Sequence, residues 1–293
     1  MTQNTDQPIL RKPEWLRKKL SLVKQRSIKS ELRDLNLHSV CEEASCPNIS
    51  ECFEKGVATV MIMGDTCTRS CKFCNVKTGK PLPLDPKEPE NVAGWLKAHG
   101  YKHIVITSVD RDDLKDDLGA KHFAQVIIKA KELSPETSIE VLTPDFQGRA
   151  DCLDYICNTP ITVFNHNLET SRRLTPQVRS ASNYQRSLDV LQYVKKHYPK
   201  IITKSGMMLG LGETVEEVFE GMQDLRDHGC DLLTLGQYLQ PSQKHLPVQE
   251  FIHPDQFAVY KERGLKMGFK AVFSGPFVRS SYLADELIEG FQV

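Results

Sequence analysis

The chain has 293 residues, of which 40% are hydrophobic and 26% charged, a balance typical of a globular protein with one large domain or two ordinary ones. Lys plus Arg equals Asp plus Glu at 38 each, so composition gives no sign of a nucleic-acid or membrane partner. The start MTQNTDQPIL is polar, unlike a signal peptide, and no apolar run is long enough for a membrane span. We therefore expect a cytoplasmic location.

The first predicted segment is a basic, helical extension over residues 1–56. Within it, PEWLRKKLSLVKQ (13–25) spaces its apolar residues along one face of a helix. We interpret its basic residues as a solvated face, with steering of an acidic partner by Arg17, Lys18 and Lys19 as the alternative.

Six short, β-branched apolar runs then recur at fairly even intervals. Because most are nearly continuous rather than alternating, they are typical of strands covered on both faces. The predicted strands cover 57–64, 103–109, 138–144, 161–167, 201–210 and 232–238.

Helix-like stretches occupy the intervals between these strands. In 214–229, Thr214 and Glu217 form a capping-box pattern. Other stretches cover 89–100, 119–133 and 183–198. Alternating strands and helices predict an α/β fold with a parallel sheet, either a partial (β/α)6 TIM-type barrel or an open doubly wound sheet. In both, ligands bind at the C-terminal ends of the strands.

Three cysteines follow the first predicted strand with the spacing C-x₃-C-x₂-C, namely Cys67, Cys71 and Cys74. Nine cysteines cannot all pair, and a reducing compartment disfavours disulfides. The spacing lacks the paired C-x₂-C units of a structural zinc site. Three thiolates suit a 4Fe–4S cube in which one iron stays open to a small molecule.

A second triplet, Cys41, Cys46 and Cys52, lies upstream with the spacing C-x₄-C-x₅-C. A second iron–sulfur cluster is the economical interpretation, and a zinc knuckle completed by a distant histidine is the alternative. The remaining cysteines are interpreted as small apolar residues in or near the core, Cys152, Cys157 and Cys230.

The 67–74 loop, with Phe73 beside its last cysteine, resembles that of the radical S-adenosylmethionine (radical SAM) enzymes. Seven blocks between residues 41 and 282 are similar, in this order, to the lipoyl synthase family of that superfamily: CEEASCPNISEC, GDTCTRSCKFCNV, TSVDRDDL, FNHNLET, MMLGLGE, GQYLQPS and GPFVRSSY. The resemblance implies a partial six-unit barrel over 57–245. An N-terminal extension (1–56) would carry the auxiliary-cluster cysteines, and a C-terminal extension (246–293) the RSSY block.

The resemblance also implies an activity, the insertion of two sulfur atoms at C6 and C8 of an octanoyl chain to give the lipoyl group. The chain would be held on a lysine of a lipoyl carrier domain or H-protein. The implied cofactors are S-adenosyl-L-methionine and two 4Fe–4S clusters, of which the auxiliary one donates sulfur. The implied partners are an electron donor such as flavodoxin or ferredoxin and a cluster-repair protein.

The resemblance assigns roles residue by residue. Cys67, Cys71 and Cys74 would hold the radical-generating cluster. The auxiliary cluster would be held by the second triplet and Ser281, with Ser280 as the alternative serine. Glu169 could bind the ribose of S-adenosylmethionine and Arg173 its carboxylate, unless the two form an ordinary helix-start pair. The full set of candidate cofactor contacts is Phe73, Thr107, Ser108, Asn165, Glu169, Arg173 and Met208.

The sequence departs from the family pattern in the 115–120 loop, where DDLGA replaces the usual Asp-Gly-Gly-Ala. The resemblance therefore does not predict the path of this loop. Three rival interpretations remain at this point. They are another radical SAM sulfur-inserting enzyme, such as one acting on a biotin precursor; a non-catalytic iron–sulfur electron carrier or metal sensor; and a zinc-binding scaffold.

Overall fold

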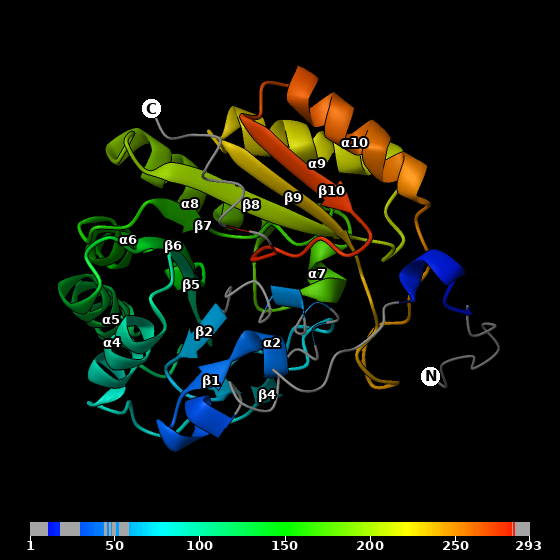
Figure 1. Cartoon of the computed structure of the whole chain (residues 1–293). Coiled ribbons are helices and arrows are strands. Elements are labelled where there is room, and N and C mark those ends of the chain that lie inside the picture. The colour runs from blue at the N-terminus through cyan, green and yellow to red at the C-terminus, as the bar shows by residue number, and fades with distance from the viewer. Residues whose placement is uncertain are drawn as a thin grey trace.

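A curved sheet of eight strands organises the protein in a computed structural model that describes residues 11–17, 30–43, 46, 48, 51–52, 59–282 and 284 (Figure 1). The strand order is β1-β2-β5-β6-β7-β8-β9-β10. All neighbouring pairs are parallel except β1 with β2. Because the parallel strands follow chain order without a reversal, the sheet is a partial barrel and not a doubly wound sheet.

The six predicted strands are all present, and residues outside the predicted runs add further short strands. The sheet consists of β1 (His38–Ser39), β2 (Thr59–Ile62), β5 (His103–Ser108), β6 (Ser138–Leu142), β7 (Val163–Asn165), β8 (Ile202–Leu209), β9 (Leu232–Gln237) and β10 (Ala271–Gly275). A separate parallel pair, β3 (Thr66–Cys67) and β4 (Lys77–Thr78), braces the cysteine loop.

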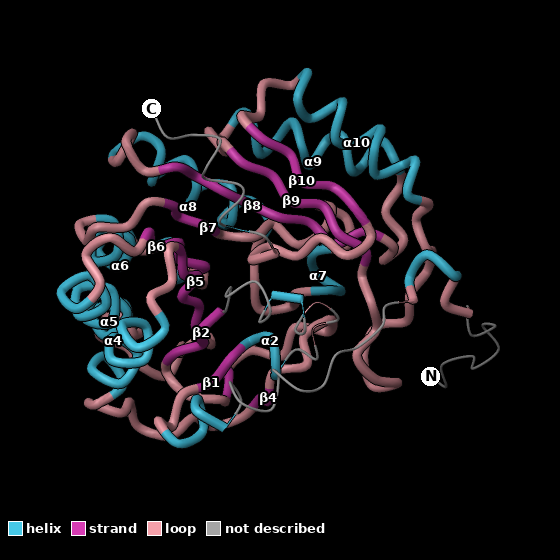
Figure 2. The backbone as a smooth tube through the Cα atoms, in the orientation of Figure 1, coloured by secondary structure: helices cyan, strands magenta, loops and turns pink. Residues whose placement is uncertain are grey.

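Long helices lie on the convex outer side of the sheet (Figure 2). The four predicted helices are confirmed as α4 (Glu88–His99), α5 (Ala120–Leu133), α8 (Tyr184–His197) and α9 (Val215–Asp227). The capping box of α9 forms as expected, and Gly100 ends α4 in the left-handed region at φ 62°. Other helical segments include η1 (Glu14–Leu16), α2 (Val40–Glu43), η2 (Phe146–Gly148), α6 (Ala150–Cys157), α7 (Thr175–Val178) and α10 (Pro254–Lys266).

The helix predicted over 13–25 lies largely outside the described residues. Its described part contains only the short 3₁₀ turn η1, and residues 30–34 are helical further along. Within the part of the chain that the structure describes, no helix is both long and apolar enough to cross a bilayer.

Two layers of buried side chains fix the barrel. Apolar residues such as Ile104, Phe123 and Leu188 fill the space between strands and helices. On the strands themselves, the ion pair of Lys204 with Glu140 is fully buried, at 2.9 Å. These contacts hold the strand ends, and the loops that follow them, in fixed positions.

Candidate active site

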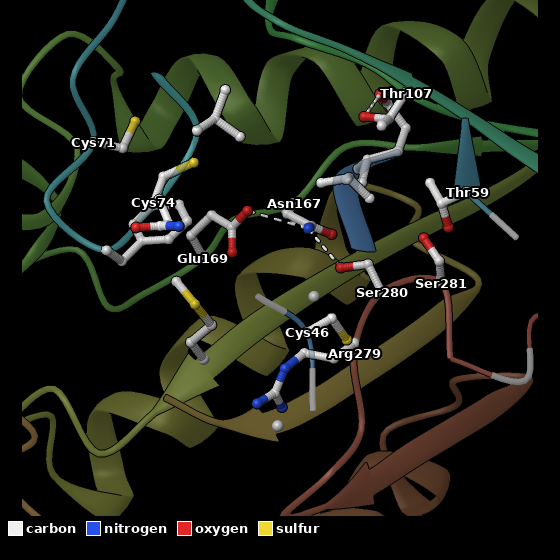
Figure 3. A pocket seen from close by; sticks show the side chains of 18 of the residues that line it. Cys46, Thr59, Cys71, Cys74, Thr107, Asn167, Glu169, Arg279, Ser280 and Ser281 are labelled. Carbon is white, nitrogen blue, oxygen red and sulfur yellow. Dashed lines mark hydrogen bonds between the residues drawn. The ribbon is translucent and has the colours of Figure 1, made fainter. Parts of the chain in front are cut away.

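A cavity of about 490 Å³ opens at the C-terminal ends of the strands, where the parallel fold places ligands (Figure 3). Both cysteine triplets line it, although they differ in spacing and lie on different structural elements. The RSSY block also lines it, through Ser280 and Ser281 among others. Residues from both ends of the chain therefore meet around one space.

The loop of Cys67, Cys71 and Cys74 is held from several sides. Cys67 ends β3, and its carbonyl accepts a hydrogen bond from the Gly79 N–H at 3.0 Å. The Lys72 N–H donates to the Val178 carbonyl at 2.9 Å, so the loop is tied to α7. These main-chain bonds fix where the three thiols enter the cavity.

The spacing of the three thiols is suited to a 4Fe–4S cube. A 4Fe–4S cube takes each thiolate on a separate iron, so its ligands are spread around one wall of a cavity. Burial raises the pKa of Cys67 to about 11, with the Asp110 carboxylate adding to the rise, and burial raises that of Cys74 to about 12. Thiolates here therefore need a cationic partner, which iron supplies.

The second triplet faces the same cavity from the N-terminal segment. Cys41 lies in the first turn of α2, and its N–H donates a hydrogen bond to Ser39 Oγ at 3.2 Å. Burial, with a contribution from neighbouring Cys46, raises the Cys41 pKa to about 12. The Cys46 N–H donates to the Cys41 carbonyl at 3.0 Å, and the Cys52 N–H donates to the Asn48 carbonyl at 2.9 Å.

The C-terminal tail closes on this segment. Asn48 Nδ2 donates to the Phe277 carbonyl at 2.6 Å, and the Tyr282 hydroxyl donates to Glu51 Oε1 at 2.9 Å. The Ser281 hydroxyl makes no hydrogen bond within the described ranges, and Ser281 lines the cavity beside Ser280, with its hydroxyl directed toward Thr59 in Figure 3. These two bonds attach the tail that carries the RSSY block to the segment that carries the three cysteines.

Five of the seven predicted cofactor contacts line the cavity: Phe73, Thr107, Ser108, Glu169 and Met208. Asn165 and Arg173 do not. Asn165 is fully buried below the cavity, where its Nδ2 donates to Glu140 Oε1 at 2.8 Å. Arg173 lies at the surface, where its Nε pairs with Glu217 Oε1 at 2.7 Å and its Nη2 donates to the Gly212 carbonyl.

Arg179 is a cavity-lining arginine that sequence reasoning did not select. Its side chain is buried, its Nη1 donates to the Asn167 carbonyl at 3.0 Å, and its Nε has no hydrogen-bond partner among the described residues. A buried, partly unpaired guanidinium is suited to a carboxylate of a bound molecule. The only signal in the sequence was its position shortly after the FNHNLET block.

Glu169 has an unusual backbone that aims its side chain into the cavity. Its φ of 72° lies in the left-handed region, and main-chain bonds to Gly206 and Met208 on β8 hold it there. Burial raises the pKa of its carboxyl, with Arg179 opposing the rise. A hydroxyl or ammonium group of a ligand would satisfy this carboxyl.

The fold and the cavity-facing cysteine loop together define a radical SAM enzyme. The model of the radical SAM superfamily matches residues 61–234. At 11% identity, SuiB of Streptococcus suis bound to S-adenosylmethionine shares the fold with a TM-score of 0.59, over 78% of this chain and 53% of SuiB. Methylornithine synthase (PylB) does so with a TM-score of 0.54, at 13% identity, over 91% of this chain and 84% of PylB.

Sequence relatives narrow the class to one family. A model of the N-terminal domain of lipoyl synthase matches residues 1–46. The lipoyl synthase of Stutzerimonas stutzeri is 55% identical over 96% of this chain and 86% of its own length. The lipoyl synthase of Colwellia psychrerythraea is 52% identical over 100% of this chain and 90% of its own length. The chain belongs to the lipoyl synthase family, and its superfamily implies a 4Fe–4S cluster and S-adenosylmethionine as cofactors.

Proposed function

We propose that this protein inserts two sulfur atoms at C6 and C8 of an octanoyl chain to form the lipoyl group. The octanoyl chain would be bound to a lysine of a lipoyl carrier domain or H-protein. The observation that carries the proposal is the meeting of both cysteine triplets and the RSSY block around one cavity. A sulfur donor and a radical source must reach the same alkyl chain, and a shared cavity permits this.

The radical side of the proposal uses the loop of Cys67, Cys71 and Cys74 as ligands. When bound, the cluster and S-adenosylmethionine supply a carbon radical able to remove hydrogen from an unactivated C–H bond. In the proposal, Arg179 binds the cofactor's carboxylate in place of Arg173, to which the sequence assigned this role. Glu169 binds a hydroxyl or ammonium group. Phe73 and Met208 supply apolar contact beside the same loop.

The sulfur-donor side uses Cys41, Cys46, Cys52 and Ser281. The free hydroxyl of Ser281 supports its choice over Ser280, whose Oγ already accepts a hydrogen bond from Asn167. A serine oxygen is a weaker ligand for iron than a thiolate, which suits a cluster that gives up its sulfide. An auxiliary 4Fe–4S cluster at this place is therefore part of the proposal.

The apolar part of the cavity wall suits the acyl chain. Met61, Val109, Leu142, Met207 and Val278 line the space and exclude water from the reacting carbons. The proposal includes an external electron donor such as flavodoxin or ferredoxin and a protein that rebuilds the spent cluster.

Two measurements on anaerobically purified protein test the proposal. About eight irons per chain are expected for two cubes. With reductant, S-adenosylmethionine and an octanoylated carrier, the carrier mass should rise by two sulfurs, with loss of hydrogen, as 5′-deoxyadenosine forms. Mass gain without octanoyl dependence, or no 5′-deoxyadenosine, would overturn it.

Two cysteine variants separate the two clusters. Cys71→Ser should abolish formation of 5′-deoxyadenosine. Cys52→Ser should leave 5′-deoxyadenosine formation in place but prevent sulfur insertion. An electron carrier would form no 5′-deoxyadenosine in any variant. Equal losses of both products in both variants would contradict the division of roles between the triplets.

A further inference from the structure

Asn167 is hydrogen-bonded to both sides of the active site. Its Nδ2 donates to Glu169 Oε1 at 3.1 Å and to Ser280 Oγ at 2.6 Å (Figure 3). Glu169 belongs to the side on which the cofactor is proposed to bind. Ser280 is the immediate neighbour of Ser281 on the sulfur-donor side. A single amide group therefore links residues that are 111 positions apart in the chain, from 169 to 280.

The strands below are shaped for this link. Gly206 of β8 lies under it, and a Cβ added there would come within 2.5 Å of Thr234 Oγ1, 3.1 Å of Asn167 Oδ1 and 3.3 Å of Ser280 Oγ. Gly236 of the neighbouring strand β9 lies in the same way beneath the Val278 carbonyl. Two strand residues without a side chain thus let the tail lie against the sheet.

Asn167 itself has little freedom to move away from this position. Its backbone carbonyl accepts from Arg179 Nη1, and the Leu168 N–H donates to Ser205 Oγ at 3.1 Å. Its Oδ1 is buried and has no hydrogen-bond partner among the described residues. The amide is therefore held at its backbone and has one acceptor left for a bound molecule.

We propose that Asn167 is a positioning residue that couples cofactor binding at Glu169 to the order of the Ser280–Ser281 tail. The inference rests on the proposed function, since it assigns the cofactor to the Glu169 side. A ligand that holds the Glu169 carboxylate also fixes the amide, which keeps Nδ2 directed at Ser280. By linkage, an ordered tail favours cofactor binding to the same degree.

The test is hydrogen exchange of residues 275–282 in the two-cluster enzyme, with and without S-adenosylmethionine. Cofactor should slow exchange of this segment about five- to tenfold in the unaltered protein, the effect expected from one hydrogen bond. Asn167→Ala and Ser280→Ala should each remove the cofactor-dependent change. The double variant should behave like either single variant, since both break one link.

A matched control is Ser274→Ala. Ser274 lies at the base of the same tail, and its Oγ donates to the Phe257 carbonyl at 2.7 Å, away from Glu169. This variant should keep the cofactor-dependent slowing. Asn167→Asp keeps the shape of the side chain but repels Glu169, so it should weaken the slowing while its iron content stays that of the unaltered protein.

The outcomes are distinct from those of the function test. If exchange of the tail does not respond to cofactor in the unaltered enzyme, or if Asn167→Ala and Asn167→Asp keep the full response, the inference is wrong. Formation of 5′-deoxyadenosine by the same samples reports the proposed function separately. Its presence alongside an unresponsive tail would overturn only the coupling, and its absence from the unaltered enzyme would overturn the function.

Discussion

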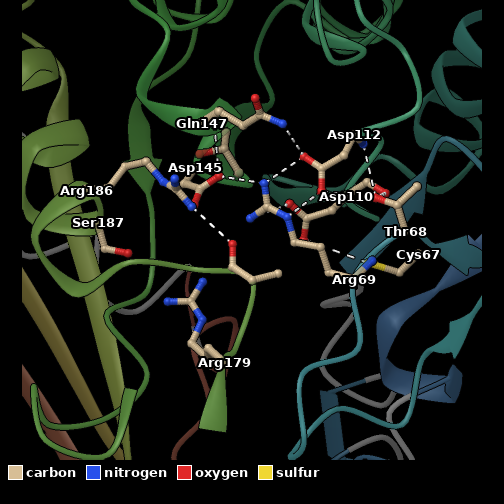
Figure 4. A network of polar contacts seen from close by, with 12 residues as sticks. Cys67, Thr68, Arg69, Asp110, Asp112, Asp145, Gln147, Arg179, Arg186 and Ser187 are labelled. Carbon is tan, nitrogen blue, oxygen red and sulfur yellow. Dashed lines mark hydrogen bonds and ion pairs between the residues drawn. The ribbon is translucent and has the colours of Figure 1, made fainter. Parts of the chain in front are cut away.

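Arg69 Nη2 lies 2.9 Å from Oδ1 of the fully buried Asp145 (Figure 4). The loop of Cys67, Cys71 and Cys74 is thus joined directly to the segment that follows β6. The same guanidinium holds Asp112 through two hydrogen bonds of 2.7 and 2.8 Å and lies 3.2 Å from Asp110 Oδ1. Burial opposes ionisation of Asp145, but the hydrogen bond and charge of Arg69 outweigh it and hold the pKa of Asp145 below its usual range. One side chain between Cys67 and Cys71 thus anchors the loop to two strand ends.

Replacing this arginine should loosen the loop. Arg69→Gln leaves Asp145, among the residues described, with Arg186 as its one remaining ion-pair partner, at 2.8 Å. Removing one partner of a buried pair costs about 3 kcal/mol. We expect a lower urea midpoint and fewer irons per chain after reconstitution. Arg173→Gln is the control, since its exposed pair with Glu217 contributes little, and its iron content and midpoint should stay unchanged. Normal iron content and stability in Arg69→Gln would contradict the anchoring role.

Arg173 and Arg179, which both follow the FNHNLET block, should differ in cofactor binding. Arg179→Gln removes the guanidinium from the cavity and should weaken S-adenosylmethionine binding roughly 10- to 100-fold, the loss expected for a hydrogen bond to a charged group. Arg173→Gln should leave the affinity unchanged. Equilibrium dialysis on the anaerobic enzyme measures both. Weaker binding in Arg173→Gln alone would instead restore the assignment made from the sequence.

The main fold followed from the sequence because most central strands are buried on both faces and are therefore nearly continuously apolar. β2 and β9, for example, are buried at every position. β10 was not predicted because only Val272 of its residues is buried, so the segment carries no comparable signal. Its pairing with β9 depends on tertiary contacts made by α10, which packs beside it.

The cysteine sites were predictable because their ligands are close together in sequence, so spacing alone carries the geometry. That Asn167, and not the predicted Asn165, lines the cavity was not predictable. β7 ends at Asn165, and the chain leaves the pleat there, so strand alternation does not describe which way Asn167 points. Likewise, Ser281 reaches the cavity only through the folding back of the tail onto Asn48 and Glu51, which no local pattern reveals.

Replacing one partner of the buried ion pair of Lys204 and Glu140 should destabilise the protein strongly, whereas replacing both partners should destabilise it much less. Both side chains are at most 1% exposed, and burial of Glu140 is offset by Lys204, so the pKa of Glu140 stays below its usual value. Lys204→Met leaves a buried carboxylate without its cation and should lower the free energy of unfolding by about 3–5 kcal/mol. Lys204→Met combined with Glu140→Gln should recover most of that loss in urea denaturation. A double variant no more stable than Lys204→Met would show that the charge itself is not the source of the cost.

His166 should make the stability of the protein depend on pH. Its Nδ1 lies 2.9 Å from the Thr143 carbonyl, which can only accept, so Nδ1 carries the proton and Nε2 accepts from the Ser187 hydroxyl at 3.1 Å. Burial, reinforced by the charge of Arg179, lowers the His166 pKa to about 4. The unfolded chain therefore binds a proton that the folded protein excludes between pH 6.5 and 4.

It follows that the free energy of unfolding contributed by this site is highest above pH 6.5 and falls as the pH drops toward 4. The full difference across that window is about 3 kcal/mol. His166→Asn keeps a donor for the Thr143 carbonyl but does not titrate. Urea unfolding at pH 7, 6 and 5 should therefore show a smaller loss on acidification in His166→Asn than in the unaltered protein. Parallel pH profiles for the two proteins would mean that His166 is protonated equally in the folded and unfolded states.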